Sequence, residues 1–181
     1  MDYWLLFFLG ACVGSFLGVV LYRLRRGGSA LKGRSVCDHC HKKIAWYDNL
    51  PLLSFLLLGG KCRWCRRPIN PEYPLIELLV GIQFVWIYWL LKINFNWFNW
   101  VEGWYSFGLL VYWLILFSGL LAIAIYDLKY MLIPDQILAP LVIISFTRLF
   151  VSHQWPVLLA AFGSMAFLGL LYLVTRGKGM G

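Results

Sequence analysis

Charged residues are scarce in this sequence. Only 13% of its 181 residues are Asp, Glu, Lys or Arg, and 8 of them are acidic, whereas 61% of the chain is hydrophobic. The mean hydropathy is +0.73. A soluble domain of this length needs more charge than this to cover its surface. The composition therefore excludes a soluble globular protein and predicts a protein that crosses a membrane several times.

Motifs of several enzyme classes are also missing. The glycine-rich residues 177–181 lack the spacing of a Walker loop or a dinucleotide fingerprint, and no Ser or Thr follows them in the chain. Serine catalysis has little support, because the three His residues lie in a cysteine-rich loop or toward the opposite membrane face. The basic residues flank apolar runs and cysteines, so nucleic acid is not an expected partner.

Long apolar runs are the main feature that is present. A run of about 20 apolar residues crosses a hydrocarbon core of about 30 Å. Such runs lie at residues 3–22, 74–91, 104–126, 136–151 and 155–174. The fourth is short enough for a tilted or partial span, and residues 47–60 are expected at the membrane interface. The fold class predicted is all-α, a polytopic helical bundle of about five spans.

Charge placement predicts the orientation of these spans. Of the 16 Lys and Arg residues, 11 lie between residues 23 and 67. Because they follow the first run, that run is predicted to be a retained anchor with its N-terminus outside, not a signal peptide. The positive-inside rule then puts the cysteine-rich loop, Asp127, Asp135 and residues 177–181 on the cytoplasmic side of the membrane. Anionic lipid is a secondary expected partner.

Three glycines in the first run share one helical face. Gly10, Gly14 and Gly18 are spaced by four residues, a pattern that lets two helices approach closely in lipid. Tight packing within the chain is the favoured interpretation and a dimer interface is the alternative. The sequence leaves the oligomeric state open.

Four cysteines in the first loop have the spacing of metal ligands. They form two Cys-x-x-Cys turns, made by Cys37, Cys40, Cys62 and Cys65. This spacing is typical of a tetrahedral four-thiolate zinc site, which would be closed and structural. The alternatives are disulfides, which a reducing cytoplasm disfavours, and unpaired thiols. His39 and His41 are conceivable substitute ligands, although four cysteines already complete the coordination.

Acidic residues near the third run are candidates for catalysis. Asp127 falls at the C-terminal end of an apolar helix, where the helix dipole opposes a negative charge, so a functional role is expected. Lys129 is a possible partner for it. Asp135 opens the next helix, where an N-cap role explains it sufficiently. Glu77 is the only remote acid that could share a proton with Asp127, and its place at a helix N-terminus favours a structural role.

Taken together, these motifs resemble those of type IV prepilin peptidases (leader peptidase and N-methyltransferase), a family of GxGD-type membrane aspartyl proteases. The similar segments are residues 14–17 and 22–24, the cysteine pairs with residues 46–54 between them, residues 73–79, residues 127–135 and residues 179–181. The resemblance implies that Asp127 is the first catalytic aspartate. Gly179 and Gly181 match the glycines of the GxGD motif, whose aspartate is expected immediately after Gly181. The 181 residues alone are therefore expected to be inactive.

The resemblance also implies a reaction. Such enzymes cleave the basic leader of prepilins and pseudopilins of type IV pili and protein secretion, at the cytoplasmic membrane face. Many then methylate the new N-terminus with S-adenosylmethionine, an activity that the family associates with the cysteine loop, although no adenosylmethionine pocket is recognisable in the residues. The alternative is a non-catalytic zinc-knuckle membrane adaptor or a degenerate family member, which would gain nothing from Asp127.

Three segments are predicted on this basis. Residues 1–22 form the first transmembrane helix, and residues 23–73 form a cytoplasmic four-cysteine zinc-binding loop that resembles a zinc ribbon. Residues 74–181 form a transmembrane aspartyl peptidase domain that is incomplete at its C-terminus.

Overall fold

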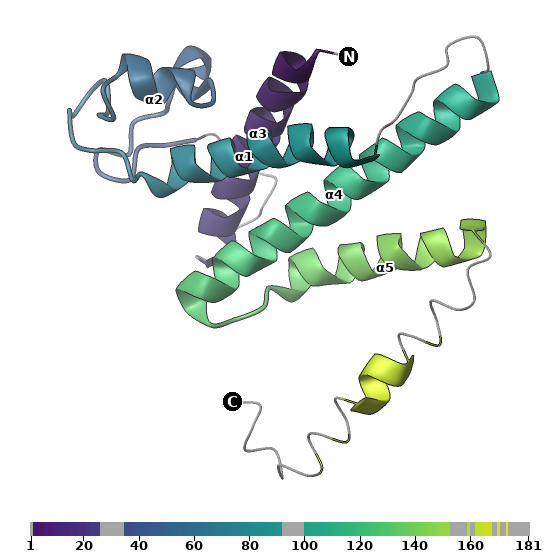
Figure 1. Ribbon diagram of the computed structural model, residues 1–181. Helices are drawn as coiled ribbons and strands as arrows, with labels where there is room; N and C mark the ends of the chain where they lie inside the picture. The colour runs from purple at the N-terminus through teal and green to yellow at the C-terminus, as the bar shows by residue number, and fades with distance from the viewer. Residues whose placement is uncertain are drawn as a thin grey trace. The chain divides into compact units, whose positions relative to one another are not determined.

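The computed structural model describes residues 2–25, 35–91 and 100–152, together with 159, 162–167, 170 and 173. The chain divides into two compact units, Met1–Leu138 and Ala139–Gly181, and each is described by itself. The elements are α1 (Tyr3–Arg25), η1 (Trp46–Asn49), α2 (Leu53–Leu57), α3 (Glu72–Leu91), α4 (Trp100–Tyr130) and α5 (Asp135–Ser152), as Figure 1 shows. Within the described ranges the protein is all-helical apart from two isolated β-bridges.

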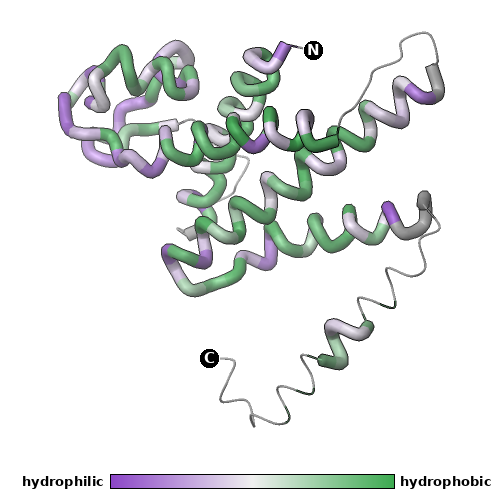
Figure 2. Tube along the Cα trace, in the orientation of Figure 1, coloured by the Kyte–Doolittle hydropathy of each residue, from purple (hydrophilic) through white to green (hydrophobic). Residues whose placement is uncertain are grey.

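Three helices are long and apolar enough to cross a membrane. The qualifying segments are Tyr3–Leu24, Glu72–Leu91 and Glu102–Tyr130, and Figure 2 shows hydrophobic residues along most of α1, α3 and α4. The 31 residues of α4 extend about 46 Å at about 1.5 Å per residue, more than the hydrocarbon core of about 30 Å. These helices confirm the predicted polytopic, all-α membrane fold.

The last two predicted spans are not among the helices that qualify as membrane-spanning in the described part of the chain. Helix α5 covers the fourth apolar run, residues 136–151, and includes Pro140, but it is not among the three helices that qualify as spans. The fifth run, residues 155–174, lies mostly outside the described residues. The total of about five spans therefore stays a prediction.

Helices α1 and α3 pack against each other along the predicted glycine face. A Cβ added at Gly10 would lie 2.7 Å from the Val80 carbonyl oxygen, and one added at Gly14 would lie 2.8 Å from the Cα of Glu77. The neighbouring atoms at Gly18 belong to Tyr73. Because the contacts run in opposite directions along the two helices, α1 and α3 are antiparallel. The close packing expected of these glycines therefore occurs within the chain.

Helices α3 and α4 are antiparallel as well. Gln83 donates to the buried Ser118 hydroxyl at 3.5 Å, and Glu72, eleven residues earlier, pairs with Lys129, eleven residues later. The buried core between α1, α3 and α4 is apolar and comprises Leu21, Ile76, Val80, Phe84, Ile87, Leu110, Leu114 and Ala122. The end of α1, the start of α3 and the end of α4 consequently lie at the same end of the bundle.

Candidate functional site

Two matching knuckles carry the four cysteines in the segment between α1 and α3. The Cys37 amide donates to the Lys42 carbonyl, and the Cys62 amide donates to the Arg67 carbonyl. A β-bridge closes each knuckle, between Val36 and Lys43 in the first and between Lys61 and Pro68 in the second. In each knuckle the backbone turns back through one residue with positive φ, directly after the second cysteine. We refer to residues 35–71 as the cysteine module.

The four sulfurs converge at one point. The Sγ atoms of Cys37, Cys40, Cys62 and Cys65 all lie within 4.8 Å of one another, and those of Cys37 and Cys65 are 3.8 Å apart. Four thiolates at about 2.3 Å from a central zinc ion would be separated by about 3.8 Å. A disulfide requires about 2.05 Å between sulfurs. The module is therefore arranged as a four-thiolate metal site.

The thiols differ in acidity. Burial raises the pKa of the Cys37 thiol to about 11, whereas the backbone N–H of Cys65 lowers the pKa of the Cys62 thiol to about 7. Metal binding requires the thiolate form of each ligand. The Cys62 thiol of the second knuckle thus loses its proton near neutral pH, whereas the Cys37 thiol of the first knuckle does not.

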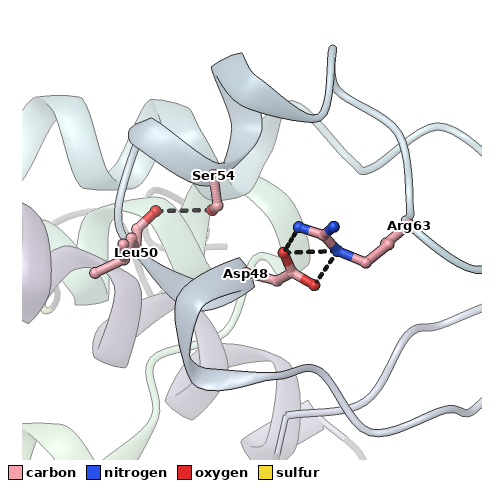
Figure 3. A network of polar contacts seen from close by, with 4 residues as sticks. All are labelled: Asp48, Leu50, Ser54 and Arg63. Carbon is pink, nitrogen blue, oxygen red and sulfur yellow. Dashed lines mark hydrogen bonds and ion pairs between the residues drawn. The ribbon is translucent and has the colours of Figure 1, made fainter.

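An ion pair and a hydrogen bond connect parts of the module. Arg63 donates from Nε and Nη2 to the carboxylate of Asp48 at 2.6 to 3.0 Å, and Ser54 donates to the Leu50 carbonyl at 2.7 Å, as Figure 3 shows. The bonds between Arg63 and Asp48 join the second knuckle to η1. The Asp48 side chain is only 8% exposed. Such bidentate pairs are geometrically specific.

A cavity of about 600 Å³ lies between the cysteine module and helices α1 and α3. Its polar wall includes Ser15 of α1 and Glu77 of α3. Facing side chains of the module and the adjoining helix ends include Asp38, Asp48, Phe55, Trp64, Tyr22 and Tyr73. This volume is within the range of small-molecule sites, about 300–1,000 Å³. The cavity combines aromatic rings with carboxylates and with the basic side chains of Arg23, Lys42 and Arg63.

The carboxylate of Glu77 is hydrogen-bonded to the cysteine module. Its Oε2 accepts a hydrogen bond from the Leu52 amide at 2.7 Å, and the Ser15 hydroxyl also bonds to this carboxylate. The partners of Glu77 are thus a turn of the module and α1, whereas the structural role expected of it was that of a charge at a helix N-terminus. Its carboxylate is engaged away from α4, which argues against its sharing a proton with Asp127.

Asp127 lies in the last turn of α4. Its carbonyl accepts the Met131 amide at 2.7 Å, and Met131 has a φ of 52°, which ends the helix. Nine residues separate Asp127 from Ser118, which is two and a half turns at about 3.6 residues per turn. Since Ser118 bonds to α3, Asp127 occupies the opposite face of α4. The side chain is exposed there.

The other predicted site residues are distributed as follows. Lys129 forms its ion pair with Glu72 of α3, so a partnership with Asp127 is not what the structure shows. Asp135 is exposed and is the first residue of α5, as its predicted position at a helix start requires. Gly179 and Gly181 lie outside the described residues.

Sequence reasoning missed the cavity and the contacts that shape it. A lone acid in an apolar run drew attention to Glu77, but nothing in the residue pattern points to Leu52 as its partner, 25 residues away. The Asp48–Arg63 pair could have been suspected from their opposite charges. Both contacts depend on how the module folds back onto the helices.

The fold and the site define a class of protein: a membrane helical bundle with a four-cysteine module at one end. Residues 8–91 match the family described as Bacterial Peptidase A24 N-terminal domain, and residues 114–181 match the Type IV leader peptidase family.

Several curated relatives are named "Prepilin leader peptidase/N-methyltransferase". The protein from Myxococcus xanthus is 40% identical over 75% of this chain, that from Vibrio cholerae 41% over 74%, and that from Aeromonas hydrophila 32% over 98%. The chain belongs to the type IV leader peptidase family.

The matched regions correspond to 36%, 51% and 67% of the lengths of these three relatives. The chain thus spans between about a third and two thirds of the relatives that it matches. No solved structure gives a significant match.

Proposed function

We propose that this chain is part of an aspartyl endopeptidase of the bacterial cytoplasmic membrane. Its substrates would be prepilins or pseudopilins, cleaved between the basic leader and the apolar helix that follows. The single observation that carries the proposal is Asp127: an exposed carboxylate in the last turn of a spanning helix, inside the segment that matches the leader peptidase family. The adaptor alternative has no support from the family matches.

The chemistry requires a second carboxylate. Without a metal or a nucleophile, amide hydrolysis needs one ionised acid to activate water and one neutral acid to protonate the leaving amine. Asp127 supplies one of them, and the other is the aspartate that the resemblance to the GxGD motif implies. Asp127 is exposed on the face of α4 opposite α3, which would leave its carboxylate accessible to a substrate helix that enters the membrane.

Replacing Asp127 tests this proposal directly. In the full-length protein, Asp127→Asn removes the ionisable group at constant size, so cleavage of a prepilin in membranes should fall at least about a hundredfold. Asp135→Asn is the matched control, because Asn starts a helix as well as Asp does, and cleavage should persist. Cleavage that survives Asp127→Asn would overturn the catalytic assignment.

Zinc is the metal that we propose for the cysteine module. Four cysteines, two knuckles and the 3.8 Å separation of the Cys37 and Cys65 sulfurs fit a closed tetrahedral site. With no open position on the metal, the ion would stabilise the module and would not activate water. We further propose that this module faces the cytoplasm, because of the basic residues around it.

Methylation of the new N-terminus is a second proposed activity, supported by the cavity. Its aromatic rings suit an adenine, and its carboxylates suit ribose hydroxyls and a sulfonium cation. S-adenosylmethionine would supply the methyl group for the new N-terminal amine, with S-adenosylhomocysteine as the product and water as the acceptor of the proton that the amine loses. We expect Ser15 and Asp38, which line the cavity, to bind and orient the reactants.

Anionic lipid is a further proposed partner. Leu56 and Leu57 of α2 are 73% and 84% exposed, close in sequence to the basic residues Lys61 and Arg63. An apolar helix flanked by positive charge suits the headgroup boundary. The module would then rest on the membrane that the three helices cross.

A further inference from the structure

The buried carboxylate of Glu77 joins the cysteine module to the helix pair. Glu77 is 8% exposed and lies opposite Gly14, where α1 packs closely against α3. Its Oε2 reaches out of the helix pair to the Leu52 amide. A buried carboxylate is stable only where hydrogen bonds compensate its lost hydration, and here the module supplies one of them.

The partner, Leu52, has a strained backbone. Its φ of 59° and ψ of −44° belong to a region that side chains other than glycine rarely adopt. Leu52 precedes α2, and no side chain caps that helix. A strained residue persists only when surrounding contacts hold it. The hydrogen bond from the Leu52 amide to the Glu77 carboxylate is one of the contacts that hold Leu52 in this conformation.

Both sides of the contact border the same cavity. Glu77 and Ser15 line it from the helices, and Asn49, Ser54 and Phe55 line it from the segment that contains Leu52. The position of the strained turn therefore decides where this wall of the cavity lies. Asp127, in contrast, is on the face of α4 turned away from α3.

We infer that Glu77 is a positioning residue for methyl transfer: its carboxylate latches the strained Leu52 turn and thereby fixes the wall of the cavity. This inference rests on the proposed methyl-transfer function. Peptide cleavage does not depend on the latch, since the two sites use different faces of the bundle. Glycine at position 52 would need no latch, because it adopts positive φ without strain.

The test uses the full-length protein in membranes and a peptide that already has the mature N-terminus, so that methylation is measured without cleavage. Transfer of a labelled methyl group should fall about tenfold in Glu77→Ala, as expected for a lost bond to a charged acceptor. Glu77→Gln keeps an acceptor and should retain most of the activity. Leu52→Gly should restore activity to Glu77→Ala.

A structural measurement accompanies the activity. Hydrogen exchange of the Leu52 amide should be slow in the wild type and in Glu77→Gln, and fast in Glu77→Ala. Glu102→Ala removes an exposed acid from the first turn of α4 and is the matched control for Glu77→Ala. Leu53→Gly is the matched control for Leu52→Gly. Neither control should alter the exchange of the Leu52 amide.

The outcomes separate the inference from the function on which it rests. Normal methylation by Glu77→Ala, or a loss that Leu52→Gly does not repair, would overturn the latch. A wild-type protein that binds no S-adenosylmethionine and transfers no methyl group would overturn the methyl-transfer function instead. In that case amide exchange still decides whether Glu77 holds the turn.

Discussion

Among individual residues, the four cysteines show how local backbone geometry changes the chemistry of identical side chains. Cys37 and Cys62 begin equivalent knuckles, yet their pKa values shift in opposite directions. Burial is the main cause of the raised pKa of Cys37, and a backbone N–H is the main cause of the lowered pKa of Cys62. The difference matters only when the metal is absent, because a bound metal deprotonates all of its thiolate ligands.

Alkylation of the metal-stripped protein should reveal this difference. The pKa of Cys62 is lowered to about 7, so its thiolate predominates above that pH. The pKa of Cys37 is raised to about 11, so Cys37 stays protonated. Since the thiolate is the nucleophile, iodoacetamide should modify Cys62 before Cys37 at neutral pH, as peptide mass mapping would show. Its rate should level off above neutral pH while that of Cys37 keeps rising. Faster modification of Cys37 would contradict the assignment.

Which single residues matter was only partly predictable. The spacing of the cysteines predicted their convergence, because two Cys-x-x-Cys turns have few other uses in a reducing compartment. The partners of Glu77 and Lys129 could not be predicted in this way. Each pairing joins residues that are far apart in the chain, and periodicity carries no information about such contacts.

At the level of helices, the close contact between α1 and α3 depends on glycines, which have no side chain to keep the helices apart. At Gly14 the nearest atoms to an added Cβ are the Glu77 Cα and the Ile76 carbonyl oxygen, at 2.8 and 2.9 Å. These are backbone atoms, so a new methyl group must push the helices apart. The spacing of the glycines predicted a close packing face, and the structure identifies α3 as the element that occupies it.

Gly14→Ala should therefore destabilise the bundle, although alanine favours helix formation. We expect a loss of about 1–3 kcal/mol from overpacking, measured as a lower midpoint of thermal unfolding in detergent. Gly108→Ala is the matched control, since no atom lies within 4 Å of a Cβ added there. It should be neutral or stabilising by up to about 1 kcal/mol. Equal behaviour of the two variants would refute the packing argument.

The Glu72–Lys129 pair fastens the start of α3 to the last turn of α4. Its side chains are 49% and 38% exposed, so the coupling energy should be modest, about 0.2–1 kcal/mol. Glu72→Lys and Lys129→Glu each place like charges together and should lower the midpoint of unfolding. The exchanged double variant should recover much of the loss. Strict additivity of the two changes would show that the pair contributes nothing.

For the molecule as a whole, composition and charge were sufficient to predict a membrane bundle with a basic loop at one end. Antiparallel packing of α1, α3 and α4 puts the cysteine module and Asp127 at that same end. A small module between two spanning helices has little core of its own. Its buried contacts are mainly the cavity wall, the Asp48–Arg63 pair and the sulfur cluster.

Removal of the metal should consequently loosen the module without unfolding the bundle. Purified protein should contain about one zinc ion per chain, and none after Cys37 and Cys40 are both replaced by Ser. In the chelated protein, proteolysis should become rapid between residues 35 and 71, while α1, α3 and α4 keep their helical signal, because their packing in the core does not involve the sulfurs. A Cys12→Ser variant is the control, since this cysteine lies in α1 and outside the cluster. Collapse of the whole helical signal on chelation would show instead that the metal holds the bundle together.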